Sequence, residues 1–209
     1  MIHRAQNEAI AETIERMRKE GVRWVDLHFL DVPGYLQHMT IPAHDIDEGS
    51  FAEGLGKLDG SSIKGFKAIE ESDMMLVPDP STFAIIPWYT GEHKTARMIA
   101  NIGEAFGGGQ FTRDPRHIAQ RAEERLLEEG YDFSLWGPEI EFFVFDSVKF
   151  DALTPYKGQG YTIESREAVW SSTGKNFPIR FKEGYYPAPP VDTLQEYRNE
   201  VALVLERDF

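Results

Sequence analysis

The apolar positions in the first hundred residues change from a helical to a strand-like period. In residues 6–19 they recur at the spacing of one helix face, and the pattern stops at Gly21. The runs VRWVDLHFLD and YLQHMTI then predict a β-hairpin, with Pro33 and Gly34 in its turn. Further strand-like runs follow at MMLVPD, FAIIPW and TARMIANI. The pattern predicts a small α+β domain, a half-open sheet packed by the first helix.

A glycine-rich stretch, GEAFGGGQF, predicts a boundary between two domains, residues 1–105 and 106–209. The second domain begins with a helix, because Asp114 is a typical N-cap and Pro115 suits the first turn. This helix is predicted to end at Gly130.

The rest of the chain has a less regular pattern. YDFSLW and EIEFFVFD are strand candidates, and residues 147–182 predict a long, functional loop region. Asp192 and Gln195 form a capping-box-like start to a last helix. The apolar stripe of this helix continues to Phe209 without a C-cap, so we expect the chain to be truncated inside a domain.

Composition excludes several classes of protein. No segment approaches the roughly 20 consecutive apolar residues of a membrane helix, and the N-terminus is not a signal peptide. The absence of cysteine excludes disulfides and thiolate metal sites, which favours a cytoplasmic protein. The net charge of −13 gives no support to nucleic-acid binding. It is typical of a solvated acidic surface, and metal-binding carboxylates or adaptation to high salt remain as alternatives.

The run GPEIEFFVFD places two glutamates on one face of a predicted strand. Glu139 and Glu141 would lie about 6.5–7 Å apart and repel by roughly 2–2.5 kcal/mol at an effective dielectric near 20. Mg²⁺ or Mn²⁺ would relieve that repulsion, each glutamate holding its own ion or both serving a two-metal pair. A surface-facing strand end with two hydrated glutamates is the alternative, and the pattern alone leaves both open.

Three segments occur in an order and at intervals that resemble the glutamine synthetase family. They are LDGSSIKGFKAIEESDMML at 58–76, WGPEIEFFVFD at 136–146 and EGYYPAPPVD at 183–192. The resemblance implies an α+β fold, with a β-grasp-like N-terminal domain followed by the first part of a larger catalytic domain built on an antiparallel sheet. It also implies a homo-oligomer of twelve subunits in two stacked rings, with active sites between neighbouring subunits.

The resemblance further implies an activity, the ATP-dependent ligation of glutamate and ammonia to glutamine through γ-glutamyl phosphate. Glu139 and Glu141 would be ligands of two or more Mg²⁺ or Mn²⁺ ions beside the ATP phosphates. Asp59 would be catalytic in the adjacent subunit's site, binding ammonium and removing its proton, and it also suits a turn. Tyr185 would lie near the ammonium pocket, with an ordinary packed tyrosine as the alternative. Ser62 would support the loop.

The remaining ligands of the family lie beyond the end of this chain, so the chain alone is expected to be inactive. One alternative within the family is a ligase for a larger amine such as a polyamine, against which Asp59 argues. Another is a non-catalytic assembly or regulatory homologue, against which the retained pair Glu139 and Glu141 argues. The sequence leaves regulation and the salinity of the source open.

Overall fold

The computed structural model describes residues 2–154, 156–171 and 177–208. Its contacts divide the chain into two compact units, Met1–Leu135 together with Asp208–Phe209, and Trp136–Arg207. Each unit is considered by itself. The predicted domain boundary after residue 105 stays a prediction. None of the described helices is both long and apolar enough to cross a membrane.

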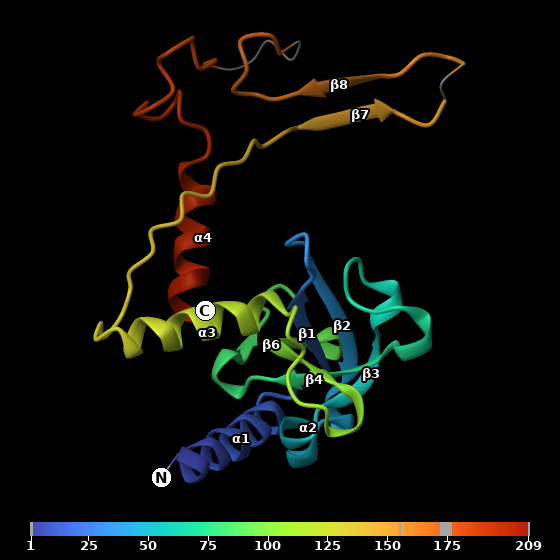
Figure 1. The fold of residues 1–209 in the computed structure, drawn as a ribbon. Coiled ribbons are helices and arrows are strands. Elements are labelled where there is room, and N and C mark those ends of the chain that lie inside the picture. Colours follow the sequence, from blue (N-terminus) through green and yellow to red (C-terminus); the bar gives the residue numbers. More distant parts are fainter. Residues whose placement is uncertain (1, 155, 172–176, 209) are drawn as a thin grey trace. The chain divides into compact units, whose positions relative to one another are not determined.

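The first unit is built on one six-stranded sheet with the strand order β2-β1-β6-β4-β3, and β5 also pairs with β6 (Figure 1). Strands β1 and β6 run parallel, whereas the other pairs are antiparallel. The strands are β1 (Trp24–Leu30), β2 (Leu36–Pro42), β3 (Leu55–Asp59), β4 (Asp73–Pro78), β5 (Ala84–Ile85) and β6 (Thr95–Glu104). The α-helices of this unit are α1 (Ile2–Lys19), α2 (Glu48–Ala52) and α3 (Pro115–Glu128).

The predicted hairpin is confirmed as β1 and β2. Its turn is held by Asp31, whose side chain accepts hydrogen bonds from the Tyr35 nitrogen at 2.7 Å and from Gln37 Nε2 at 3.0 Å. The Gly34 nitrogen donates to the Asp31 carbonyl, and Gly34 has a φ of 93°. That left-handed conformation costs glycine little, because glycine has no Cβ.

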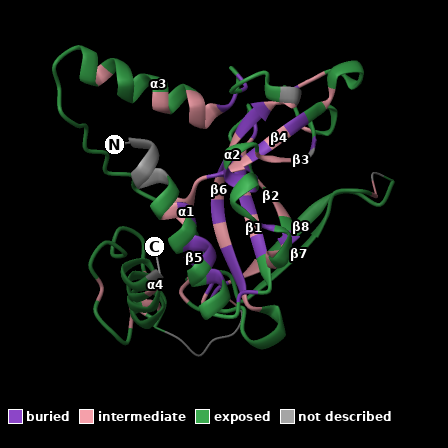
Figure 2. Ribbon diagram, turned by 90° about the horizontal axis from the view of Figure 1, so that it is seen from below, coloured by how far each residue is buried: buried purple, intermediate pink, exposed green. Residues whose placement is uncertain are grey.

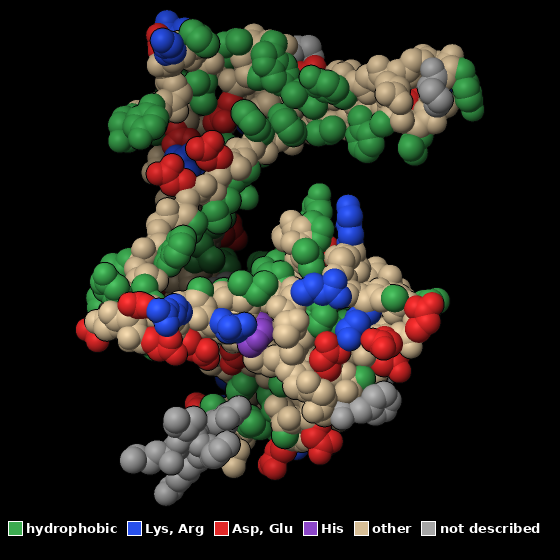
Figure 3. Space-filling view, viewed as in Figure 1, with side chains coloured by type: hydrophobic (Ala, Val, Ile, Leu, Met, Phe, Trp, Pro, Cys, Tyr) green, Lys and Arg blue, Asp and Glu red, His purple; other side chains and the backbone are tan. Residues whose placement is uncertain are grey.

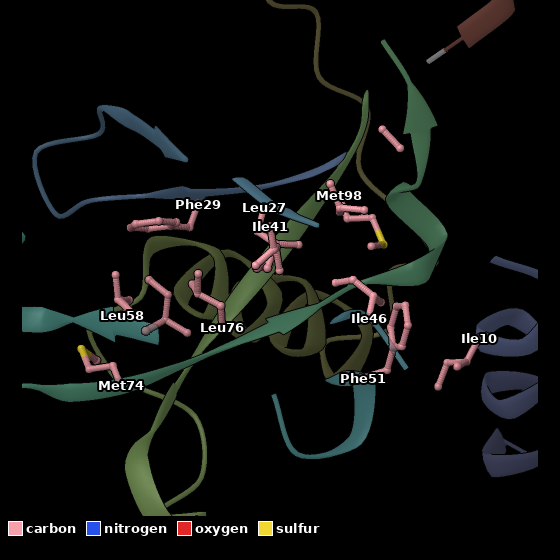
Figure 4. Close-up of a cluster of buried hydrophobic side chains, with 14 of the residues drawn as sticks. Ile10, Leu27, Phe29, Ile41, Ile46, Phe51, Leu58, Met74, Leu76 and Met98 are labelled. Atoms are coloured by element: carbon pink, nitrogen blue, oxygen red, sulfur yellow. The ribbon is translucent and has the colours of Figure 1, made fainter. Parts of the chain in front are cut away.

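The core lies between the sheet and helices α1 and α2. Strand β1 alternates buried and more exposed positions, and Leu27 and Phe29 are on its buried face (Figure 2). Helix α1 contributes Ile10, and α2 contributes Phe51, to the same cluster (Figure 4). Each such side chain stabilises the fold by about 1.5–3 kcal/mol when it is fully buried. The α+β expectation is thereby confirmed for this unit.

The second unit contains the hairpin β7 (Ser147–Asp151) and β8 (Gly160–Glu164) and helix α4 (Gln195–Asp208). The prediction that residues 147–182 form a loop region was therefore wrong in part. Val148 and Phe150 of β7 pair with Ile163 and Tyr161 of β8, so one face of the hairpin is apolar, yet most of its side chains stay exposed. The capping-box-like pattern placed the start of the last helix at Asp192, whereas α4 begins at Gln195, and the carboxylate of Asp192 accepts a hydrogen bond from the Leu194 nitrogen at 3.1 Å.

The strands predicted at YDFSLW and EIEFFVFD are not formed. Residues 131–146 belong to no helix or strand, and no described strand pairs with them. A strand is held by hydrogen bonds to a neighbour, and apolar composition alone does not supply one. Large hydrophobic side chains of this segment, among them Ile140 and Phe143, are exposed, and green hydrophobic side chains are widespread on the surface drawn in Figure 3.

Candidate functional site

The motif D-G-S-S begins at the last residue of β3. Asp59 caps a short 3₁₀ turn, Gly60–Ser62, and its Oδ1 accepts hydrogen bonds from the Ser61 nitrogen at 2.9 Å and the Ser61 hydroxyl at 2.7 Å. The Ser62 hydroxyl donates to Oδ2 at 3.1 Å. These bonds fix the carboxylate in one orientation while the side chain stays exposed to solvent. Both serines of the motif therefore support the aspartate, as predicted for Ser62.

The glycine of the motif is required by close packing. Gly60 is buried, and its nitrogen donates to the Ser72 carbonyl at 2.7 Å. A Cβ at this position would lie 2.5 Å from Met74 Sδ and 3.0 Å from Lys67 Cγ. Only glycine leaves these neighbours in place, so the turn after Asp59 is determined by packing against β4 and Lys67.

The electrostatic surroundings of Asp59 favour its ionised form. The hydrogen bond from the Ser61 hydroxyl is the largest of several that hold the pKa of Asp59 below its usual value, against a smaller opposing effect of desolvation. Asp73 lies opposite Asp59 in the register of β3 and β4, and it is also exposed. An exposed carboxylate with a fixed orientation and a second carboxylate opposite it attracts cations.

Glu139 and Glu141 are both exposed in the segment that forms no strand. The argument that they share one strand face therefore does not apply to this structure. Among the residues that the structure describes, no group of three or more histidine, aspartate or glutamate side chains is arranged to hold a metal ion. The pair fits Mg²⁺ or Mn²⁺ in the kind of donor atom, but it supplies only part of the near-octahedral oxygen set that Mg²⁺ demands.

Tyr185 is 84% exposed and packs edge to face against Tyr186, with 4.4 Å between the ring centroids. It is thus no core residue of the second unit, and its ring and hydroxyl are accessible. The four candidate residues fall in both units, Asp59 in the first and Glu139, Glu141 and Tyr185 in the second.

An ion pair that the sequence analysis missed fixes the end of the glutamate-containing segment. Arg166 donates from Nη2 and Nε to Asp146 Oδ1, at 2.6 and 2.9 Å, and its backbone nitrogen donates to Oδ2 at 2.6 Å. The bonds from the Arg166 side chain are the main cause of the lowered pKa of Asp146. No spacing rule joins residues that lie 20 positions apart, and the only signal in the sequence is an aspartate that ends an aromatic run.

A second missed pair lies next to the D-G-S-S motif. Lys67 Nζ is 2.5 Å from Glu104 Oε2, at the end of β6. Both residues line a cavity of about 380 Å³ together with Glu70, Glu71 and Asp73. The loop after Asp59 is thereby attached to the far end of the sheet's longest strand.

Comparisons with known proteins match both parts of the chain. Residues 21–105 match the family described as the glutamine synthetase β-grasp domain. Residues 112–208 match the family described as the glutamine synthetase catalytic domain. A protein of Sulfolobus acidocaldarius named glutamine synthetase is 52% identical over 194 residues, which are 93% of this chain and 40% of that protein. One of Aquifex aeolicus with the same name is 43% identical over 197 residues, 93% of this chain and 41% of that protein.

The fold has a counterpart among solved structures. The cryo-electron-microscopy structure of Plasmodium falciparum glutamine synthetase matches with a TM-score of 0.74 and 20% identity, over 94% of this chain and 39% of that one. At this identity the likeness shows the fold alone. The chain spans about 40% of the length of the curated relatives it matches. Since the two family matches together cover most of its residues, the chain belongs to the glutamine synthetase family.

Proposed function

We propose that this chain is the β-grasp domain and the first part of the catalytic domain of a glutamate–ammonia ligase. The complete enzyme would use ATP to join glutamate and ammonia through γ-glutamyl phosphate. The observation that carries the proposal is the D-G-S-S turn, which presents the ionised, exposed carboxylate of Asp59 on a loop fixed by Ser61, Ser62 and Gly60. The two family matches and the names of the curated relatives support it.

Asp59 would bind the ammonium ion and accept a proton from it. A carboxylate suits both steps, because its charge attracts the cation and its oxygens accept the proton that leaves the amine nucleophile. The serine hydroxyls keep the carboxylate in one orientation, so that its lone pairs face a fixed direction. Tyr185 would contribute its accessible ring face and hydroxyl to the same ammonium pocket.

Glu139 and Glu141 would supply carboxylate oxygens to two or more Mg²⁺ or Mn²⁺ ions beside the ATP phosphates. Such ions, when bound, neutralise charge on the phosphoryl group during transfer. This chain would contribute the two glutamate side chains as ligands of the metal ions. Their exposure leaves both carboxylates accessible to an ion and to the further ligands that a complete site requires.

The complete site would need residues from elsewhere, because this chain spans about 40% of the length of its curated relatives. We propose a cytoplasmic homo-oligomer, a dodecamer as in the family, in which Asp59 enters a neighbouring subunit's site. The chain alone would then be inactive.

The first measurement is the mass of the intact subunit in its source, by denaturing mass spectrometry. A mass well above 23.9 kDa fits the proposed ligase. The purified native protein is then assayed for phosphate release that depends on ATP, glutamate and ammonium together, with a linear diamine in place of ammonium as the comparison.

Each outcome identifies one function. Release with ammonium supports the ligase, whereas release only with the diamine reassigns the protein to a γ-glutamyl-polyamine ligase of the same family. No release with either amine, together with no binding of Mn²⁺, overturns the proposal in favour of a non-catalytic assembly or regulatory homologue.

A further inference from the structure

We propose that Lys67 is a positioning residue for Asp59, because its ion pair with Glu104 fixes the D-G-S-S turn against the end of strand β6. The inference rests on the proposed function, in which Asp59 binds ammonium. Lys67 itself would touch neither substrate nor metal.

Lys67 contacts the turn through both its backbone and its side chain. Its nitrogen donates a hydrogen bond to the Gly60 carbonyl at 3.2 Å. Its Cγ and Cβ are 3.0 and 3.1 Å from the place that a Cβ on Gly60 would occupy. The aliphatic part of Lys67 therefore packs on the residue that follows Asp59, and a movement of Lys67 would be transmitted to the turn.

The charged end of Lys67 is held by a strand. Its Nζ lies 2.5 Å from Glu104 Oε2, and the two side chains are 17% and 30% exposed. Glu104 is the last residue of β6 and lies opposite Met74 of β4 in the sheet register. Because the pair is largely shielded from water and one partner belongs to the sheet, it restrains Lys67 more than an exposed pair would.

Aromatic packing shields the pair and joins the same loop to the next segment. Lys67 Nζ lies 5.8 Å from the centroid of the Phe111 ring, which packs edge to face on Phe66 at 5.1 Å. Phe66 is buried, and its carbonyl accepts a hydrogen bond from the Arg113 guanidinium. The segment from Asp59 to Lys67 is thus attached at the Asp59 turn, at Phe66 and at the Lys67 ammonium.

The test is Lys67→Met in the complete native enzyme, since methionine keeps an aliphatic chain beside Gly60 and removes the ammonium group with its charge and its hydrogen bond to Glu104. We expect the KM for ammonium to rise about tenfold, in line with the loss of one charged hydrogen bond. The KM values for glutamate and ATP should stay within about twofold, because Lys67 is not expected to contact either. The matched control is Lys94→Met, which removes another ion pair of the first unit, Lys94 Nζ to Glu20 Oε2 at 3.1 Å, and should leave all three KM values unchanged.

A second readout does not depend on activity. In the complete native enzyme, Lys67→Met should speed hydrogen exchange at the amides of Gly60, Ser61 and Lys67, and Lys94→Met should not. The double variant Lys67→Glu with Glu104→Lys exchanges the two charges, and it should partly restore both slow amide exchange and a low KM for ammonium. If Lys67 acted only through its shape, the double variant would restore neither.

The outcomes separate this inference from the proposed function. If Asp59→Asn abolishes ammonium-dependent synthesis while Lys67→Met changes neither the KM for ammonium nor the amide exchange, only the positioning role is overturned. An equal rise of all three KM values in Lys67→Met also overturns it, because that indicates general loss of structure. If Asp59→Asn keeps a normal KM for ammonium, the proposed role of Asp59 is wrong and the positioning role is overturned with it.

Discussion

Asp114 joins the first turn of helix α3 to strand β6 through a hydrogen bond with Ile102. Its Oδ2 accepts from the Ile102 nitrogen at 3.0 Å, and its Oδ1 accepts from the Arg116 nitrogen at the same distance. The side chain is only 1% exposed. A residue that the sequence identifies as an N-cap therefore also anchors its helix on the sheet.

Asp114→Ala should lower the free energy of unfolding of the first unit by about 2–4 kcal/mol. The lost cap accounts for about 1 kcal/mol, and the Ile102 N–H left without its partner accounts for about 1–3 kcal/mol. Asp114→Asn keeps an acceptor oxygen and should cost about half as much. Urea unfolding of the 209-residue chain measures both variants.

The control for this prediction is Asp132→Ala, which removes an exposed aspartate beyond the end of the same helix. It should change the free energy of unfolding by less than about 0.5 kcal/mol. A loss in Asp114→Ala no larger than in this control would show that the bond to Ile102 does not hold the helix.

The fold of the first unit could be predicted because its buried apolar residues recur at the regular spacing of a strand or of a helix. Val25, Leu27 and Phe29 alternate with the more exposed Asp26 and His28, and this is the alternation of a strand with one buried face. Helix α1 buries one stripe in the same way. The hairpin turn and the cap of α3 were predictable for a local reason, since proline, glycine and aspartate determine backbone geometry by themselves.

The second unit was harder to predict because its backbone depends on partners that no local pattern specifies. Glu139 and Glu141 alternate with Ile140 and Phe142 as they would in a strand, but Ile140 is 81% exposed and no described strand pairs with the segment. Apolar alternation indicates a strand only where a neighbour completes its hydrogen bonds. The hairpin β7–β8 was missed for the converse reason, since it has partners and little burial.

Sequence motifs identified the candidate site residues, but they did not identify the residues that hold these side chains in place. Asp59 was identifiable from D-G-S-S, whereas its support through Lys67 depends on Glu104, 37 residues away. Glu104 comes close to this loop because the register of β4 and β6 places it opposite Met74, and Met74 packs beside Gly60. Long-range register is a property of the assembled sheet, so the sequence alone could not show the pair.

Gly60→Ala should destabilise the first unit and disturb the Asp59 turn. The new Cβ would lie 2.5 Å from the sulfur of Met74, which is only 1% exposed and has little room to move. Overpacking of this kind costs about 1–3 kcal/mol. Urea unfolding measures the loss, and Gly160→Ala is the control because a Cβ there meets nothing within 4 Å. Equal stability of the two variants would contradict the packing argument for this glycine.

Ser61→Ala should raise the pKa of Asp59 toward its usual value, because the Ser61 hydroxyl is the largest cause of the lowering. A carboxyl whose pKa is lower in the folded than in the unfolded state stabilises the fold above its unfolded pKa. That stabilisation is lost as the pH falls through the folded value. The difference in stability between wild type and Ser61→Ala should therefore be present at neutral pH and shrink in acid.

Carbon-13 NMR titration of the Asp59 carboxyl measures this shift in the 209-residue chain. The control is Ser81→Ala, since Ser81 donates to Asp79 with the same geometry, 3.0 Å from its nitrogen and 2.7 Å from its hydroxyl. That variant should raise the pKa of Asp79 and leave Asp59 unchanged. A pKa of Asp59 that responds equally to both variants would contradict the assignment of its lowering to Ser61.

Glu139→Gln and Glu141→Gln should each weaken Mn²⁺ binding by the complete protein. We expect a loss of at least about tenfold, because even the removal of groups that only support metal ligands costs about that much. Glutamine keeps the size of the side chain and removes its charge, so the fold should be unaffected. Mn²⁺ affinity is measured by electron paramagnetic resonance at fixed protein concentration, with Glu123→Gln on the exposed face of α3 as the control. If all three variants bind Mn²⁺ as the wild type does, the two glutamates are hydrated surface groups, and the non-catalytic homologue becomes the better account of this chain.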